Sequence, residues 1–339
     1  MNDLIPRLRH WLQTNLVFRL INFFYAKVIN LIAWSKKIVL PGFDGIPLYD
    51  VAVFFGNGLW EGQLTSRASA IAYNFFVALF PTIIFFFTII PFIPVDHFQE
   101  MLLGVMEEFV PTQAYSAVEG TIIDIVTRPR GGLLSIGFVL AMYFSTNGIA
   151  SLAEGFNSSV HITETRSWFQ HRLVCLLLVI ILSLLIILSL ALISLGNFTF
   201  GFLSRHGILS DRLIYYMLQG VRWFILIALV FFGNSFLYYF APTRRNRFRF
   251  FSAGSTLSTI LILAITMAFN YYVNNFSSYN ALYGSIGTLL IVLLWIYFNS
   301  IILLIGFELN ASIGIARRNN LTSLPEASDK LRIKENSSK

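Results

Sequence analysis

The chain has 339 residues, of which 56% are hydrophobic and only 12% are charged, and its mean hydropathy is +0.70. Soluble globular domains carry about 25% charged residues, so this composition excludes a soluble fold and indicates a polytopic membrane protein. The net charge of +7 does not predict a nucleic-acid partner, because an excess of lysine and arginine in a membrane protein usually marks cytoplasmic loops.

The N-terminal region, residues 1–66, precedes the first long apolar segment. Apolar residues between Leu16 and Trp34 recur at helical spacing, with basic and amide residues largely on the other side. This pattern predicts a cationic amphipathic helix that lies in the membrane interface rather than crossing it. Proline and glycine residues at 41–47 then predict a loop, followed by a short segment at Leu48–Trp60.

Six apolar windows, almost free of charged residues, are each long enough to cross a bilayer as a helix. They lie at 68–94, 132–153, 173–196, 223–241, 251–273 and 286–309. The last two belong to one uncharged stretch from Phe250 to Phe307, in which polar residues at 274–280 predict a reversal of the chain. The predicted fold class is therefore an all-α bundle of six transmembrane helices, occupying residues 67–311.

Basic residues are distributed unevenly between the two sides of this predicted bundle. One side holds 19 of the 24 lysine and arginine residues, and the other side holds only five arginines, at positions 128, 130, 205, 212 and 222. By the positive-inside rule, both termini are predicted to be cytoplasmic. The C-terminal tail, residues 312–339, is polar and is predicted to be disordered.

The long outer connection, residues 95–131, contains two amphipathic stretches separated by Pro111. One interpretation is an amphipathic helical hairpin that caps the bundle at the outer interface. The other interpretation is a gating element above a cavity.

Polar residues recur inside the predicted spans, where each polar group needs a partner because hydrocarbon offers none. Every span except the third carries an asparagine, and Pro81 removes a backbone hydrogen bond from the first span and predicts a kink there. The candidate cavity or gate residues are Asn74, Pro81, Asn147, Asn234, Asn270, Asn299 and Glu308.

Two interpretations of these residues stay open. Asparagine, serine and threonine can act as hydrogen-bond partners between transmembrane helices, contributing about 0.6–2 kcal/mol each. Alternatively, the polar faces of five helices converge on a hydrated cavity that accepts a polar headgroup or solute. Glu308 is either an interfacial anchor close to Arg317 and Arg318, or part of an inner gate or a proton-linked site.

Several short segments resemble a known family. They are Arg67-Ala-Ser-Ala-Ile-Ala-Tyr73 with Leu79-Phe-Pro81, Tyr283-Gly-Ser-Ile-Gly287, Leu294-Trp-Ile-Tyr297 and Leu304-Ile-Gly-Phe-Glu-Leu-Asn310. Over about residues 60–315, the chain is similar to the YihY/BrkB family of bacterial inner-membrane proteins, formerly labelled ribonuclease BN. The resemblance implies six crossings in the bacterial cytoplasmic (inner) membrane, but it does not supply a molecular activity.

The sequence contains no motif typical of an enzyme. It lacks G-x-S-x-G, H-E-x-x-H, H-x-H-x-D and a P-loop, its five histidines have no zinc-ligand spacing, and it has a single cysteine. We therefore expect no catalytic residues, ribonuclease activity included, and no metal or cofactor. The expected function is that of a transporter-like or lipid-handling protein with a polar intramembrane cavity. The alternative is a non-transporting envelope scaffold or assembly partner.

Four arginines lie close together in the connection after the fourth span: Arg244, Arg245, Arg247 and Arg249. At a cytoplasmic face they would attract anionic headgroups, at about 1 kcal/mol per charge. The alternative is that these charges only fix the topology. The expected partners are thus membrane lipids, anionic phospholipid among them, and not nucleic acid, while envelope proteins and a homo-oligomer stay open.

Overall fold

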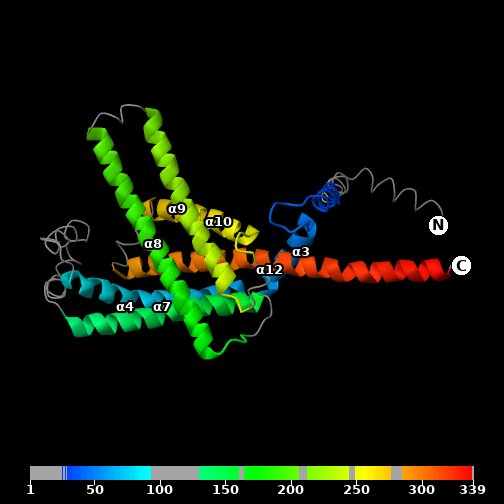
Figure 1. Ribbon diagram of the computed structural model, residues 1–339, viewed down its shortest axis with the longest axis horizontal. Helices are drawn as coiled ribbons and strands as arrows, with labels where there is room; N and C mark the ends of the chain where they lie inside the picture. The colour runs from blue at the N-terminus through cyan, green and yellow to red at the C-terminus, as the bar shows by residue number, and fades with distance from the viewer. Residues whose placement is uncertain are drawn as a thin grey trace, which may run out of the picture. The chain divides into compact units, whose positions relative to one another are not determined.

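The computed structural model describes residues 25, 27, 29–92, 130–159, 164–205, 212–243, 249–275 and 285–337. Within these ranges every regular element is a helix (Figure 1). The elements are α3 (Leu48–Glu61), α4 (Leu64–Ile89), the 3-10 helix η1 (Ile90–Phe92), α7 (Gly131–Ser159), α8 (Trp168–Arg205), α9 (Arg212–Phe240), α10 (Ala253–Asn275) and α12 (Ser285–Ser337).

Six of these helices contain segments that are long and apolar enough to cross a membrane, which confirms the predicted fold class. The segments are Leu64–Ile89, Gly131–Ser159, Trp168–Ser189, Gln219–Phe240, Ala253–Tyr272 and Leu289–Asn319. The first ends before the predicted position 94, because Pro91 has no backbone N–H to donate to the carbonyl four residues earlier, and Ile90–Phe92 form the 3-10 helix η1 instead. The third begins five residues earlier than predicted, at Trp168, where Ser167 caps the helix.

The amphipathic additions to the bundle are described only in part. The end of the predicted N-terminal helix is present, since residues 29–35 are helical. The predicted outer hairpin at 95–131 lies outside the described residues except for its last two positions. Both additions therefore stay predictions.

The chain forms two compact units whose limits differ from the predicted division. One unit comprises residues 1–58 together with 309–339, and the other comprises residues 59–308. In the first unit, Arg317 pairs with Asp44 at 3.4 Å, and the backbone N–H of Leu48 donates to the carbonyl of Ile38. Residues of the N-terminal region and of the C-terminal tail therefore belong to the same compact unit, and the predicted division of the chain into three segments stays a prediction.

The C-terminal tail also differs from its prediction, because α12 continues as a helix to Ser337. The tail is polar, which favours disorder. It is also rich in alanine, leucine, glutamate, lysine and arginine, which are strong helix formers, and these residues favour continuation of the helix.

The hydrophobic core of the second unit lies near one end, which we call the Arg67 end. There α4, α8 and α10 begin, α7 and α9 end, and α12 reaches Glu308. The ring of Phe156 in α7 stacks on the ring of Phe307 in α12, with 4.3 Å between the ring centroids. It also contacts the ring of Tyr238 in α9 edge-on, with 5.4 Å between the centroids. Figure 1 shows α4 and α7 side by side, with α8 and α9 steeply inclined to them. The core thus fixes the helix ends at which charged side chains enter the bundle.

Candidate functional site

A buried ion pair joins three helices at the Arg67 end of the second unit. Arg67 lies in the first turn of α4, and its Nη1 donates to the carbonyl of Gly155 at 2.8 Å and to Ser159 Oγ at 2.7 Å, both near the end of α7. Its Nη2 lies 3.9 Å from Oε2 of Glu308 on α12, and Glu308 is only 4% exposed. We call this arrangement the Arg67–Glu308 pair.

The Arg67–Glu308 pair is not fully satisfied by hydrogen bonds. Charge-assisted hydrogen bonds between nitrogen and oxygen are about 2.7–2.9 Å long, so the 3.9 Å contact is electrostatic rather than a direct hydrogen bond. Arg67 Nε and Nη2 are buried, and neither has a hydrogen-bond partner among the described residues. A buried donor without a partner costs free energy, so this geometry is not explained by stability alone.

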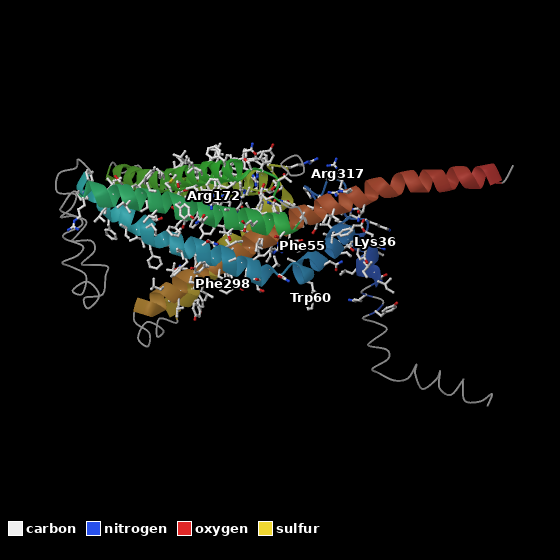
Figure 2. The ribbon with its side chains drawn as sticks, turned by 90° about the horizontal axis from the view of Figure 1, so that it is seen from below. Lys36, Phe55, Trp60, Arg172, Phe298 and Arg317 are labelled. Atoms are coloured by element: carbon white, nitrogen blue, oxygen red, sulfur yellow. The ribbon has the colours of Figure 1, made fainter. Side chains whose placement is uncertain are left out.

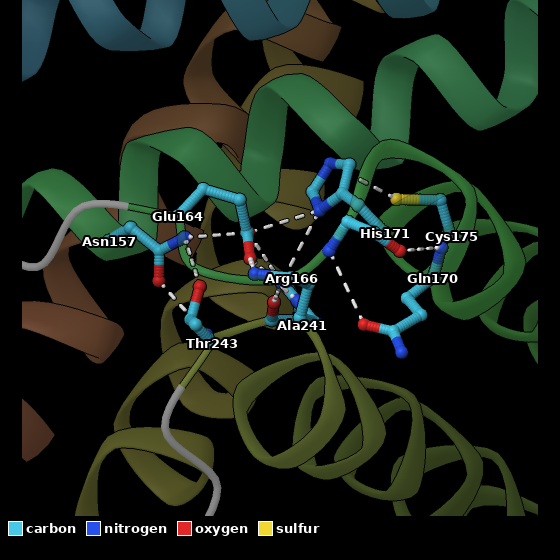
Figure 3. Close-up of polar contacts among 9 residues, drawn as sticks. Asn157, Glu164, Arg166, Gln170, His171, Cys175, Ala241 and Thr243 are labelled. Carbon is cyan, nitrogen blue, oxygen red and sulfur yellow. Dashed lines mark hydrogen bonds and ion pairs between the residues drawn. The ribbon is translucent and has the colours of Figure 1, made fainter.

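A second polar cluster, the α7–α8 network, consists of Asn157, Glu164, Arg166, His171 and Thr243 (Figure 3). Asn157 is buried near the end of α7 and binds Thr243 twice. Its Nδ2 donates to Thr243 Oγ1 at 2.9 Å, and its Oδ1 accepts from the Thr243 backbone N–H at 3.0 Å. Asn157 therefore holds the end of α7 to the segment that follows α9.

Glu164 is the central carboxylate of the α7–α8 network. Arg166 donates to both of its oxygens, at 2.8 and 2.7 Å, and Nδ1 of His171 lies 3.1 Å from Oε2. Partial burial by itself raises the pKa of Glu164. The hydrogen bonds from the side chain and backbone of Arg166 and from Thr243, with the charge of Arg166, outweigh burial and lower the pKa from 4.5 to about 2. Glu164 is thus ionised at neutral pH.

The network continues into α8 and α9. Arg166 Nη2 donates to the carbonyl of Ala241 at 2.9 Å, just beyond the end of α9. Ser167 and Gln170 form a capping box at the start of α8, each side chain accepting from the other residue's backbone N–H at 3.3 Å. These bonds explain why α8 begins where it does.

Cys175 lies beside His171, with Sγ 3.7 Å from Nε2. A cysteine, a histidine and a carboxylate in this order can act as a nucleophile, a base and an orienting group. Cys175 is 1% exposed and belongs to the hydrophobic core, so a substrate cannot reach its sulfur in this conformation. The arrangement is therefore structural.

The predicted asparagines contact neighbouring helices in pairs. Asn74 Nδ2 donates to Ser151 Oγ at 3.2 Å, which links α4 to α7. Asn234 Nδ2 donates to Thr259 Oγ1 at 3.0 Å, which links α9 to α10. These contacts do not gather the asparagines at one point of the bundle, and the cavity role stays a prediction.

The remaining predicted residues are placed as follows. Asn147 accepts a hydrogen bond from Arg172, Asn299 donates to the carbonyl of Trp295 in its own helix at 2.8 Å, and Asn270 is exposed. Pro81 is buried, and α4 continues through it without interruption, so its kink stays a prediction. Of the four loop arginines, Arg249 is exposed, and Arg244, Arg245 and Arg247 lie outside the described residues.

Sequence reasoning did not identify the α7–α8 network or the partner of Glu308. The available signal for the α7–α8 network was a group of charged and titratable residues beside a span, namely Glu164, Arg166 and His171. Their partners Asn157 and Thr243 are 86 residues apart, and no pattern predicts that contact. Among the described residues, no group of three or more His, Cys, Asp or Glu side chains could hold a metal ion.

Comparison with known proteins gives one family. The family model described as virulence factor BrkB matches residues 56–330. The ribonuclease-like protein YfkH of Bacillus subtilis (strain 168) is 32% identical over 255 residues, which cover 75% of this chain and 90% of that protein. A UPF0761 membrane protein of Psychromonas ingrahamii is 28% identical over 288 residues, which cover 83% of this chain and 92% of that protein. The UPF0761 membrane protein NTHI0384 of Haemophilus influenzae is 25% identical over 271 residues, which cover 79% of this chain and 96% of that protein. No solved structure matches the chain.

Proposed function

Because the chain belongs to the BrkB family of membrane proteins, we propose that it is a transporter-like or lipid-handling protein of the bacterial inner membrane. In this proposal a polar route passes through residues 59–308, and the Arg67–Glu308 pair closes it at the Arg67 end. The observation that carries the proposal is this buried pair of charges, in which two nitrogens of Arg67 have no hydrogen-bond partner among the described residues. Charged residues inside membrane helices are costly and mark transport routes and proton relays.

The position of the pair suits a gate. Its side chains come from α4, α7 and α12, so any movement that separates these helices must break it. Removing one partner of a buried ion pair costs about 3–5 kcal/mol, because it leaves the other charge buried and uncompensated, so loss of either charge should favour separation of these helices. Protonation of Glu308 would remove the attraction, and the equilibrium between closed and open states would shift.

The ribonuclease-like name of YfkH is not extended to this chain in our proposal. Hydrolysis of a phosphodiester requires a positioned acid and base or clustered metal ligands. In the described part of the chain, the histidine and carboxylate that lie together are His171 and Glu164, and Arg166 already occupies both carboxylate oxygens. This cluster supports a structural role rather than catalysis.

Reconstitution into liposomes tests the proposed function. A fluorescent phospholipid reports movement of lipid between leaflets, and an entrapped dye reports movement of a polar solute. We expect the wild-type protein to accelerate either the movement of lipid or the movement of solute. Glu308→Gln should change that rate several-fold. The rate in this variant should also depend less on pH than the rate in the wild type. Arg317→Gln is the matched control, because it breaks an exposed ion pair with Asp44 in the other unit.

Two results would contradict the proposal. The first is wild-type protein, correctly folded in liposomes, that moves neither probe faster than protein-free liposomes. The second is Glu308→Gln that behaves like the wild-type protein in both assays and at every pH.

A non-transporting scaffold or assembly partner for envelope proteins is the second candidate. The pairwise contacts of Asn74 and Asn234 favour it, because they show asparagines acting as interhelical hydrogen-bond partners. For a scaffold, the reconstituted protein stays inactive with both probes. In-cell cross-linking from exposed positions would then capture the same envelope protein in the wild type and in Glu308→Gln.

A further inference from the structure

Arg172 is a charged residue inside a candidate membrane span, and it is distinct from the Arg67–Glu308 pair. It is the fifth residue of α8, and its Nη1 donates to Asn147 Oδ1 on α7. Figure 2 labels it beside the green ribbon of α7. Its guanidinium carbon lies 5.7 Å from the ring centroids of both Tyr143 and Trp168, within the range of a cation–π interaction.

The positive charge of Arg172 is not neutralised by the described residues. Arg67, Arg166 and Arg317 each pair with a carboxylate, but Arg172 forms no ion pair within the part of the chain that the structure describes. Its one side-chain hydrogen bond there goes to Asn147. A guanidinium has five N–H donors, so Arg172 retains donors in the geometry that binds a phosphate through two hydrogen bonds.

Exposed apolar side chains extend from Arg172 in one direction. Tyr143 and Trp168 are 53% and 72% exposed. On α7, Leu140 and Ile136 precede Tyr143 on the same helical face, and both are exposed. Because α7 ends at the Arg67 end, Leu140 and Ile136 lie on the side of Tyr143 that faces away from that end.

We propose that Arg172 binds the phosphate group of a phospholipid. Tyr143 and Trp168 flank the headgroup, as aromatic residues do at membrane interfaces, and Asn147 holds the guanidinium in place. The acyl chains lie along the exposed apolar residues Leu140 and Ile136 of α7. The site is on the exposed surface of the second unit, and lipid binding there does not require the chain to transport anything.

A nearby helix N-terminus is not the source of the proposed site. The first backbone N–H groups of α8 are partly occupied by the Ser167–Gln170 capping box, which uses side chains of the chain itself. The recognition therefore comes from the Arg172 side chain, and its strength should depend on that guanidinium and on the flanking rings.

Titration of the purified, delipidated full chain with phosphatidylglycerol, followed by native mass spectrometry, tests the site. We expect Arg172→Gln to weaken the tightest lipid-binding event about tenfold, the loss of one charge-assisted contact. Arg172→Lys keeps the charge but not the paired donors, so its loss should be smaller. Trp168→Leu removes one ring and leaves the bond to Asn147, and it should also weaken binding. Arg222→Gln, which removes an arginine from another span, is the matched control and should bind like the wild type.

Further probes separate the parts of the ligand. Diacylglycerol lacks the phosphate, so its binding should be equal in the wild type and in Arg172→Gln. Inorganic phosphate and glycerol phosphate lack acyl chains and should not displace phosphatidylglycerol at equal concentration.

The outcomes that overturn the proposal are distinct. Unchanged lipid binding in folded Arg172→Gln, or an equal loss in Arg222→Gln, excludes a specific role for Arg172. Displacement by inorganic phosphate would show a site for the free anion instead of a lipid. If Arg172→Gln does not fold, Arg172→Lys and Trp168→Leu decide, because wild-type binding in both overturns the assignment. None of these readouts measures transport, so the site and the proposed function can fail separately.

Discussion

At Gly306, α12 lies close against α10 and α9. A Cβ atom there would meet Ser258 Oγ, would lie 2.5 Å from Tyr238 Oη, and would lie 2.7 Å from the backbone carbonyl oxygen of Gly254. A carbonyl oxygen belongs to the main chain, so it can move only if its helix shifts. Overpacking of this kind typically costs about 1–3 kcal/mol.

We therefore expect Gly306→Ala to lower the thermal stability of the purified protein in detergent. Gly314→Ala is the matched control on the same helix, because a Cβ there would have no neighbour within 4 Å. Alanine is the better helix former by about 0.5–1 kcal/mol, so the control should be neutral or stabilising. Equal melting temperatures for Gly306→Ala and the wild type would show that α12 and α10 can separate without cost.

Glu164 gives a stability contribution that depends on pH. Its pKa is lower in the folded chain, about 2, than its ordinary value of 4.5, so folding favours the ionised form. This contribution is fully present above about pH 4.5 and is lost as the pH falls toward 2. The difference in melting temperature between the wild type and Glu164→Gln should therefore be constant near neutral pH and shrink below about pH 4.5.

The control for this titration is Glu154→Gln, which removes an exposed carboxylate from the preceding helix. The same pH profile in both variants would contradict a specific role for Glu164. If the Glu164→Gln difference does not change between pH 5 and pH 2, Glu164 is not held as an ionised partner of Arg166.

At the residue scale, the sequence supported the choice of polar side chains but not their partners. Asparagines in apolar helices must find partners, and Asn74 and Asn234 each bond to a residue of another helix. It could not predict that Glu308 would face Arg67, since 241 positions separate them in the sequence. Such contacts depend on helix packing, which local patterns do not specify.

Helix pairs are the scale at which the two interpretations of the asparagines differ. Asn234 is 4% exposed and joins α9 to α10 through Thr259, while Asn299 bonds to a carbonyl of its own helix. We expect Asn234→Ala to cost stability, by about 0.6–2 kcal/mol, and Asn299→Ala to cost less. Melting temperatures of the two variants in detergent measure this difference.

A transport assay completes the comparison. A change of rate in Asn299→Ala without a loss of stability would support the predicted cavity role of this residue. The opposite order of stabilities, with Asn299→Ala melting lower than Asn234→Ala, would contradict the assignment of Asn234 as the interhelical partner.

Helix ends could be predicted where local signals were strong. The short segment at Leu48–Trp60 corresponds closely to α3, Leu48–Glu61, because proline and glycine residues delimit it. The early start of α8 was missed, although Ser167 and Gln170 have the spacing of a capping box. The predicted third span was limited to the uncharged window that begins after Arg172, so the capping residues before Arg172 were not considered as its start.

At the scale of the whole molecule, the number of spans follows from composition, but the grouping of the chain does not. Charge-poor apolar windows predict six crossings, and the described residues contain six candidate spans. The pairing of Asp44 with Arg317 within one unit links segments that are 273 positions apart. A hydropathy pattern carries no information on such a contact, so the termini were assigned to separate regions.

The orientation of the whole chain in the membrane is the last prediction. The connections at the Arg67 end, with the terminal regions, contain 19 of the 24 lysine and arginine residues, so we expect this end to face the cytoplasm. Cys175→Ser gives a cysteine-free background, and the buried position of Cys175 suits this small replacement. In that background, Thr165→Cys and Gly132→Cys each place one thiol at an exposed position at opposite ends of the second unit. A membrane-impermeant thiol reagent added to spheroplasts should label position 132 and not position 165, and disruption of the membrane should allow both to react. Labelling of position 165 in intact spheroplasts, with position 132 protected, would show that the chain has the inverse orientation.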